Sequence, residues 1–69
     1  MKLQFNTWVE EFGGARLLAK KLEVTDHAVR VWMRGEGSPH AETIDAIIKL
    51  SKGVLTFEQI FKESTRSKK

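Results

Sequence analysis

The side chains best suited to recognition chemistry gather between residues 26 and 34, where two arginines and a histidine recur at helical spacing. On a helix that turns 100° per residue, His27, Arg30 and Arg34 lie on one side together with Val31. Such a side offers hydrogen-bond donors around an apolar group, and Asp26 adds an acceptor at its start. Donors, an acceptor and an apolar contact are what the base edges of a DNA major groove require.

Catalytic chemistry is not expected from the other residues. No carboxylate pair, His/Cys pair or Ser/His/Asp set falls at a convincing spacing, and no glycine-rich phosphate loop is present. The two histidines, His27 and His40, are thirteen positions apart and there is no cysteine, so we expect neither a metal nor any other cofactor. A chain of 69 residues also leaves little room for a ligand pocket. We therefore expect a binding protein rather than an enzyme.

Composition is compatible with a polyanionic partner without identifying one. Twelve basic and nine acidic residues give a formal net charge of +3, and much of that surplus lies in residues 66–69. The lack of cysteine favours a reducing cytoplasm, and no apolar run is long enough to cross a membrane. We expect one domain over residues 1–63 and a disordered basic tail over 64–69.

Turn and capping signals divide the chain into five helical segments, which predicts an all-α, compact five-helix domain. Asn6 or Thr7 is expected to cap the first segment, Thr25 the third, and Ser38 the fourth with Pro39 at its first position. Thr56 and Gln59 form a capping box for the fifth. The predicted helices cover residues 7–12, 15–22, 26–34, 39–51 and 57–63.

Apolar residues at helical spacing predict the core. They lie on one face of each segment and include Leu18, Ala19, Leu22, Val29, Trp32, Met33, Ile44, Ile47, Ile48, Phe57, Ile60 and Phe61. Trp8 is expected either in this core or in a contact between two copies of the chain.

Residues 15–35, ARLLAKKLEVTDHAVRVWMRG, resemble the helix-turn-helix of the Cro and phage-repressor family. The matching positions are the small Ala19, the inward Leu18 and Leu22, the turn residue Val24, the cap Thr25, the anchors Val29 and Trp32, and the terminal Gly35. Residues 53–61, GVLTFEQIF, resemble the end of small Cro-like regulators of the YdaS type. Glu23 departs from the family, which most often has a left-handed glycine there, at a cost of about 1 kcal/mol.

The resemblance implies a transcriptional regulator, a Cro-like repressor, with residues 26–34 as the recognition helix in the major groove of double-stranded DNA. The residues expected to contact bases are Asp26, His27, Arg30 and Val31, and those expected to contact the DNA backbone are Gly14, Ala15, Arg16, Thr25, Arg34 and Ser38. Lys20 and Lys52 are weaker backbone candidates.

The same resemblance implies a cytoplasmic, nucleoid-associated homodimer. Its two recognition helices would enter successive major grooves of a pseudo-palindromic operator, about 34 Å apart. The contact between the copies is expected to involve the fifth helix and residues 54–55.

Other interpretations stay open at this stage. The arginines and His27 can form an ordinary solvated helix face, and Asp26 can serve only to stabilise a helix start. The same fold can belong to an antitoxin or adaptor whose main partner is a protein. RNA binding is less favoured, because no exposed aromatic residues for stacking on bases are expected in this segment.

Overall fold

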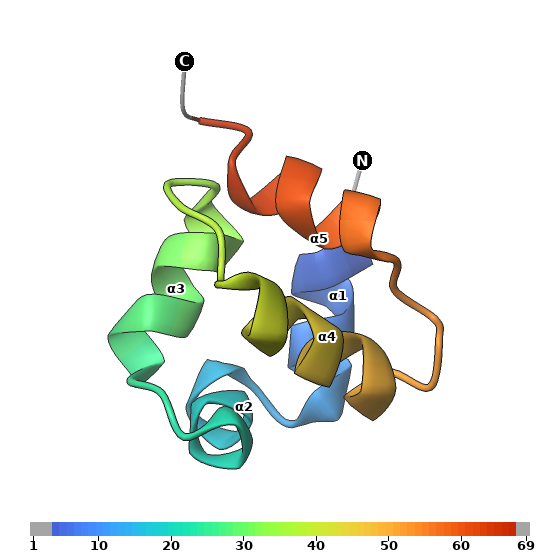
Figure 1. Cartoon of the computed structure of the whole chain (residues 1–69). Helices are drawn as coiled ribbons and strands as arrows, with labels where there is room; N and C mark the ends of the chain where they lie inside the picture. Colours follow the sequence, from blue (N-terminus) through green and yellow to red (C-terminus); the bar gives the residue numbers. More distant parts are fainter. Residues whose placement is uncertain (1–3, 68–69) are drawn as a thin grey trace.

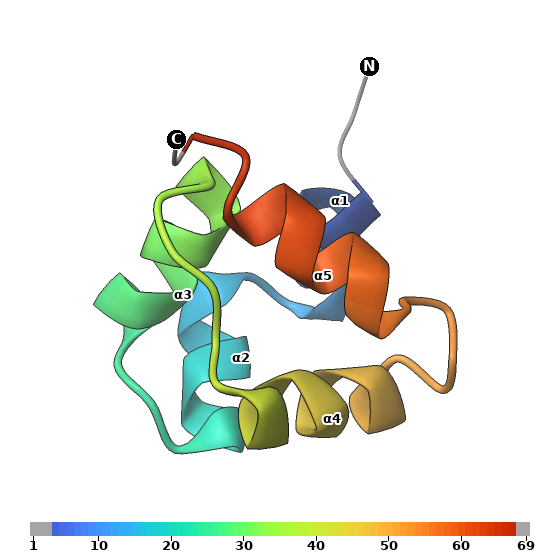
Figure 2. The same cartoon turned by 45° about the horizontal axis from the view of Figure 1, so that its top comes forward.

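The computed structural model describes residues 4–67, which form five α-helices and no strand (Figure 1). The helices are α1 (Gln4–Phe12), α2 (Ala15–Leu22), α3 (Asp26–Arg34), α4 (Ala41–Leu50) and α5 (Phe57–Ser64). Helix α2 packs against α1, α3 and α4, while α5 packs against α1, α3 and α4 from the other side (Figure 2). The all-α, five-helix prediction is confirmed. Within the described residues, no helix has the length and apolar character needed to span a membrane.

Capping chemistry sets the ends of the helices as the sequence predicts in α3 and α5. The Thr25 hydroxyl accepts a hydrogen bond from the N–H of Ala28, and left-handed Gly35 ends α3. At the start of α5, the Gln59 N–H donates to the Thr56 hydroxyl and the Thr56 N–H donates to the Gln59 side chain. Both boundaries therefore follow from local sequence.

One core lies between the five helices. Each helix contributes apolar residues to it, and Leu55 enters from the segment before α5; the buried members are Phe5, Val9, Leu18, Ala19, Val29, Trp32, Ile44, Ile47, Leu55 and Ile60. The predicted core residues Leu22, Met33 and Ile48 are partly buried against this cluster, as is Trp8. Phe57 and Phe61 are 49% and 47% exposed, so of the predicted apolar face of the fifth helix only Ile60 is buried, and the assignment of Phe57 and Phe61 to the core was wrong.

Helix α1 begins earlier than its local capping signals predict. Residues 4–6 are already helical, so neither Asn6 nor Thr7 caps it. Phe5 is fully buried, and its N–H donates to the Glu63 carboxylate of α5 at 2.8 Å. A distant side chain thus satisfies an N–H group at the start of this helix, which local sequence does not reveal.

Helix α4 begins later than predicted. Ser38 and Pro39 lie in the connecting segment, and His40 is the N-cap residue, without a hydrogen bond from its side chain. Pro39 is buried instead of standing at the first helical position. Burial of its ring therefore outweighs the local preference of proline for a helix start.

The end of the chain is ordered further than predicted. Ser64 is the last residue of α5 and is fully buried, with its hydroxyl donating to the Ile60 carbonyl at 2.6 Å. The N–H of Gly37 donates to the Ser64 carbonyl, and residues 66 and 67 bond to the end of α3. The predicted disorder of 64–69 is therefore wrong for 64–67, while residues 68 and 69 lie outside the described residues.

Candidate nucleic-acid interface

A three-residue turn, residues 23–25, joins α2 to α3 and sets their relative orientation. Glu23 has φ 59° and ψ 41°, the left-handed conformation that the resemblance implied at this position. The N–H of Val24 donates to the Ala19 carbonyl at 3.0 Å, which closes the end of α2. A non-glycine residue thus holds a backbone conformation that favours glycine, and the tight turn is kept.

Buried side chains fix α3 against α2. Leu18 and Val29 are fully buried, Ala19 and Trp32 nearly so, and Val24 is partly buried between the two helices. The small side chain of Ala19 allows a close approach of the two helices. One side of α3 is therefore held in the core, and its opposite side is left to face solvent.

The solvent-facing side of α3 carries the donors that the helical spacing predicts. His27 is exposed, and the side chains of Arg30 and Arg34 are 60% and 53% exposed. Val31 is only partly exposed because it packs against the core and lies beside Gly37. The three polar residues are thus presented together, whereas Val31 offers less free surface than the sequence predicts.

Two of the predicted contact residues bond to each other. Asp26 and Arg30, one helical turn apart, form an ion pair with an N–O distance of 3.5 Å. Arg34 Nε donates to the Glu36 carboxylate at 3.1 Å. All four side chains are about half exposed or more, and pairs of this kind contribute at most about 1 kcal/mol. These two ion pairs orient the guanidinium groups but are weak enough for the side chains to change conformation.

The start of α2 offers backbone donors, though not all of those predicted. Gly14 is the N-cap residue and makes no side-chain cap, and the first turn contains no acidic residue. The N–H of Gly14 donates to the Val9 carbonyl at 2.9 Å, so it is not the free donor that the sequence interpretation expected, and a contact of Gly14 with the DNA backbone stays a prediction. The next N–H groups, from Ala15 onward, precede the first intrahelical bond, made by Leu18. This end of α2 therefore carries partial positive charge.

Basic side chains of α2 lie beside the start of α3. Arg16 and Lys20 are exposed and line one shallow depression together with Asp26. This depression joins the open end of α2 to the donor-bearing side of α3. We call this continuous surface the α2–α3 face; its side chains are Arg16, Lys20, Asp26, His27, Arg30 and Arg34.

The remaining predicted contact residues, Thr25, Ser38 and Lys52, lie in three different parts of the molecule. Thr25 is exposed at the start of α3, although its hydroxyl is already used in capping. Ser38 is partly buried in the segment between α3 and α4. The loop between α4 and α5, to which Lys52 belongs, lies on the opposite side of the molecule from α3 (Figure 1). Lys52 therefore does not belong to the α2–α3 face.

The sequence interpretation missed two residues that act on α3. Glu36 pairs with Arg34, and its position just after the helix was an available signal. Arg66 donates to the Met33 carbonyl across 33 positions of sequence, a contact that no local pattern indicates. Within residues 4–67, no group of three or more potential metal ligands is close enough to hold an ion.

Comparison with family models, curated proteins and solved structures found no match for this chain. The geometry of the α2–α3 face is therefore what bears on function.

Proposed function

We propose that α2 and α3 form a Cro-like helix-turn-helix and that the protein is a regulator of transcription that binds specific sequences in double-stranded DNA. The observation that carries this proposal is the two-sided character of α3. Val29 and Trp32 hold one side in the core, while His27, Arg30 and Arg34 cover the other. A helix of this width fits the major groove, and its exposed donors suit base edges.

Base reading rests chiefly on Arg30. A guanidinium group can donate two parallel hydrogen bonds to O6 and N7 of guanine, a contact worth about 1–3 kcal/mol of discrimination. Arg30 must turn from Asp26 to reach a base, and the exposed ion pair opposes this by at most about 1 kcal/mol. Asp26, once released, is free to accept from cytosine N4. In the free protein the ion pair thus holds both side chains on the exposed side of α3, and in the complex hydrogen bonds to the bases would replace it.

Phosphate contacts would come from the edges of the α2–α3 face. The open N–H groups at the start of α2 suit a phosphate oxygen, and Arg16 adds a positive charge beside them. Arg34, at the other end of α3, would contact the backbone on the far side of the groove. Such contacts set the register of α3 and carry no sequence information.

A second copy of the chain is the proposed partner on DNA. Val54, Phe57 and Phe61 are 66%, 49% and 47% exposed, and the two rings stack with centroids 6.4 Å apart. We call these three residues the α5 patch. Glu58 and Lys62 form an exposed ion pair with each other on the same helix, at 3.6 Å, so an antiparallel second copy would offer each of them an alternative partner of opposite charge. The patch is therefore an exposed apolar surface with charges of both signs beside it.

The position of the α5 patch suits binding to two half-sites. The segment that leads into α5 and the start of α5 lie at the opposite end of the molecule from α3 in both views (Figures 1 and 2). The molecule measures 29 × 24 × 24 Å, and successive major grooves on one side of DNA are about 34 Å apart, so two copies side by side have the size needed to reach both grooves.

The dimer is tested by analytical ultracentrifugation of the wild type and of the double variant Phe57→Ser/Phe61→Ser. The wild type should sediment as a dimer at micromolar concentration and the variant as a monomer. Leu17→Ser is the control, because Leu17 is a similarly exposed apolar residue outside the patch. A wild type that stays monomeric both free and on DNA would refute this contact.

DNA binding itself is tested by selection from random duplexes with the purified protein. We expect enrichment of a two-fold symmetric site that binds much more tightly than a scrambled duplex, with affinity that falls as salt rises. Equal and weak binding to all duplexes would contradict the proposal. The exposed α5 patch would then favour an antitoxin or adaptor that binds a protein, and a binding assay with the patch variant would follow.

A further inference from the structure

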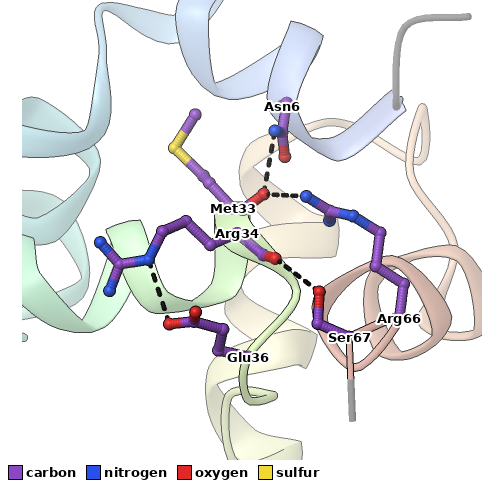
Figure 3. Close-up of polar contacts among 6 residues, drawn as sticks. All are labelled: Asn6, Met33, Arg34, Glu36, Arg66 and Ser67. Atoms are coloured by element: carbon purple, nitrogen blue, oxygen red, sulfur yellow. Dashed lines mark hydrogen bonds and ion pairs between the residues drawn. The ribbon is translucent and has the colours of Figure 1, made fainter.

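The last turn of α3 is held by the end of the chain (Figure 3). Arg66 Nη2 donates to the Met33 carbonyl at 2.6 Å, and Arg66 Nη1 donates to the Glu63 carbonyl at 2.7 Å. Ser67 follows along the same edge, with its hydroxyl donating to the Arg34 carbonyl at 3.1 Å and its N–H donating to the Gly35 carbonyl at 2.8 Å. We call residues 65–67 the C-terminal strap.

The strap satisfies carbonyl groups that a helix end leaves open. The last four carbonyls of an α-helix have no intrahelical donor, and this end carries partial negative charge. The guanidinium of Arg66 brings both donors and positive charge to that end. Met33 is additionally bound from α1, because Asn6 Nδ2 donates to the same carbonyl at 3.0 Å. The end of α3 is therefore tied to α1 and to the strap at once.

Close packing at Gly35 supports the same arrangement. Gly35 is buried and has φ 78°, and a Cβ added there would stand 2.5 Å from Arg66 Cγ. The side chain of Arg66 thus lies directly over the residue that ends α3. Glycine is needed at this position both for its backbone conformation and for the space that the arginine occupies.

We propose that Arg66 is a positioning residue: the C-terminal strap holds the last turn of α3 so that Arg30 and Arg34 meet DNA in a fixed register. This inference rests on the proposed DNA-binding function. A nine-residue helix has few internal hydrogen bonds, and without the strap its final turn opens more often. Opening would shift the register in which α3 presents Arg30, while the long side chain of Arg34 still reaches a phosphate from the opened turn, so sequence preference would fall more than affinity for DNA in general.

A direct phosphate contact by Arg66 is the competing role, and the geometry argues against it. Both terminal nitrogens of the guanidinium group already donate to protein carbonyls, at 2.6 and 2.7 Å. For an arginine bound in this way, the fixed planar geometry of the guanidinium group matters more than its charge. Arg66→Lys, which keeps the charge and loses the paired donors, therefore separates the two roles.

The experiment compares the wild type, Arg66→Ala and Arg66→Lys with Lys49→Ala as the control. Lys49 is an exposed cation near the end of α4 and does not touch α3 in its ion pair with Asp45. The first measurement is amide hydrogen exchange at Gly35 and Glu36, whose N–H groups close the end of α3. We expect exchange about fivefold faster in Arg66→Ala, the factor for one lost hydrogen bond of average strength, and no change in Lys49→Ala.

The second measurement is affinity for the selected duplex and for a scrambled duplex at several salt concentrations. We expect Arg66→Ala to lose about fivefold of its preference for the selected site, with the salt dependence on scrambled DNA unchanged. Arg66→Lys should recover only part of that preference. Uniform weakening on all duplexes, a salt slope reduced by about 1 and full rescue by lysine would overturn the positioning role in favour of a phosphate contact.

Failure of the strap and failure of the DNA-binding proposal give different results. Unchanged exchange at Gly35 and Glu36 in Arg66→Ala would overturn the strap whatever the protein binds. If amide exchange is faster in Arg66→Ala but the wild type prefers no duplex, the strap exists and the proposal that it positions a DNA-reading helix is overturned. If Arg66→Ala fails to fold, exchange in Arg66→Lys decides the matter, because this variant retains the charge at the end of α3.

Discussion

Replacing Glu23 by glycine should stabilise the protein, because Glu23 holds the turn between α2 and α3 in a left-handed conformation, φ 59° and ψ 41°. That conformation costs a non-glycine residue about 1–2 kcal/mol. Glycine in turn makes the unfolded chain more flexible, which removes about 0.4–1 kcal/mol. The Glu23 side chain is exposed and forms no ion pair within residues 4–67, so little else is lost. The net gain in the free energy of unfolding should be about 0.8 kcal/mol, the middle of the range that these two effects allow.

The assay is thermal unfolding followed by circular dichroism. For a domain of this size, the gain in Glu23→Gly corresponds to a rise in Tm of about 3–6 °C. Glu23→Gln removes the charge while keeping the Cβ atom, so it should leave Tm nearly unchanged. Lys21→Gly places glycine inside α2 and should lower the free energy of unfolding by about 0.5–1 kcal/mol. A Tm for Glu23→Gly at or below the wild-type value would refute the reasoning about this turn.

Two further substitutions test the capping of α5 and the contact with phosphate. Thr56→Ala removes the acceptor for the Gln59 N–H and should lower the free energy of unfolding by about 1 kcal/mol in urea denaturation; no change would mean that the capping box contributes nothing. Arg16→Ala should weaken binding to all duplexes alike and reduce the salt slope by about 1 in fluorescence anisotropy titrations. A sequence-dependent loss in Arg16→Ala would instead make Arg16 a base-reading residue.

Local signals in the sequence were enough to predict the unit formed by α2 and α3. The Thr25 cap, the terminal Gly35 and the buried anchors Val29 and Trp32 all act within a few residues of one another. The left-handed turn at Glu23 was implied only by the resemblance to the Cro and phage-repressor family and not by the local preference of glutamate. The exposed side of α3 followed from helical periodicity, because a helix fixed on one side must present the other.

Contacts between distant segments account for what the sequence did not predict. The early start of α1 depends on Glu63, and the order of residues 64–67 depends on the end of α3. Pro39 was predicted at the first position of the fourth helix from its conformational preference, but it is buried in the segment before α4. The bond from the Gly14 N–H to the Val9 carbonyl is, by contrast, local: it closes the end of α1, so the N–H expected to be free at the start of α2 is already used.

The most direct test of the central claim, that α3 reads DNA sequence, is a per-base specificity profile of Arg30→Ala beside that of the wild type. Each base pair of the selected site is varied in turn and the affinity of both proteins is measured. We predict a loss of about 1–3 kcal/mol in discrimination at one base pair of each half-site, with the other positions unchanged. A profile of Arg30→Ala identical to that of the wild type would contradict the assignment of α3 as the reading helix.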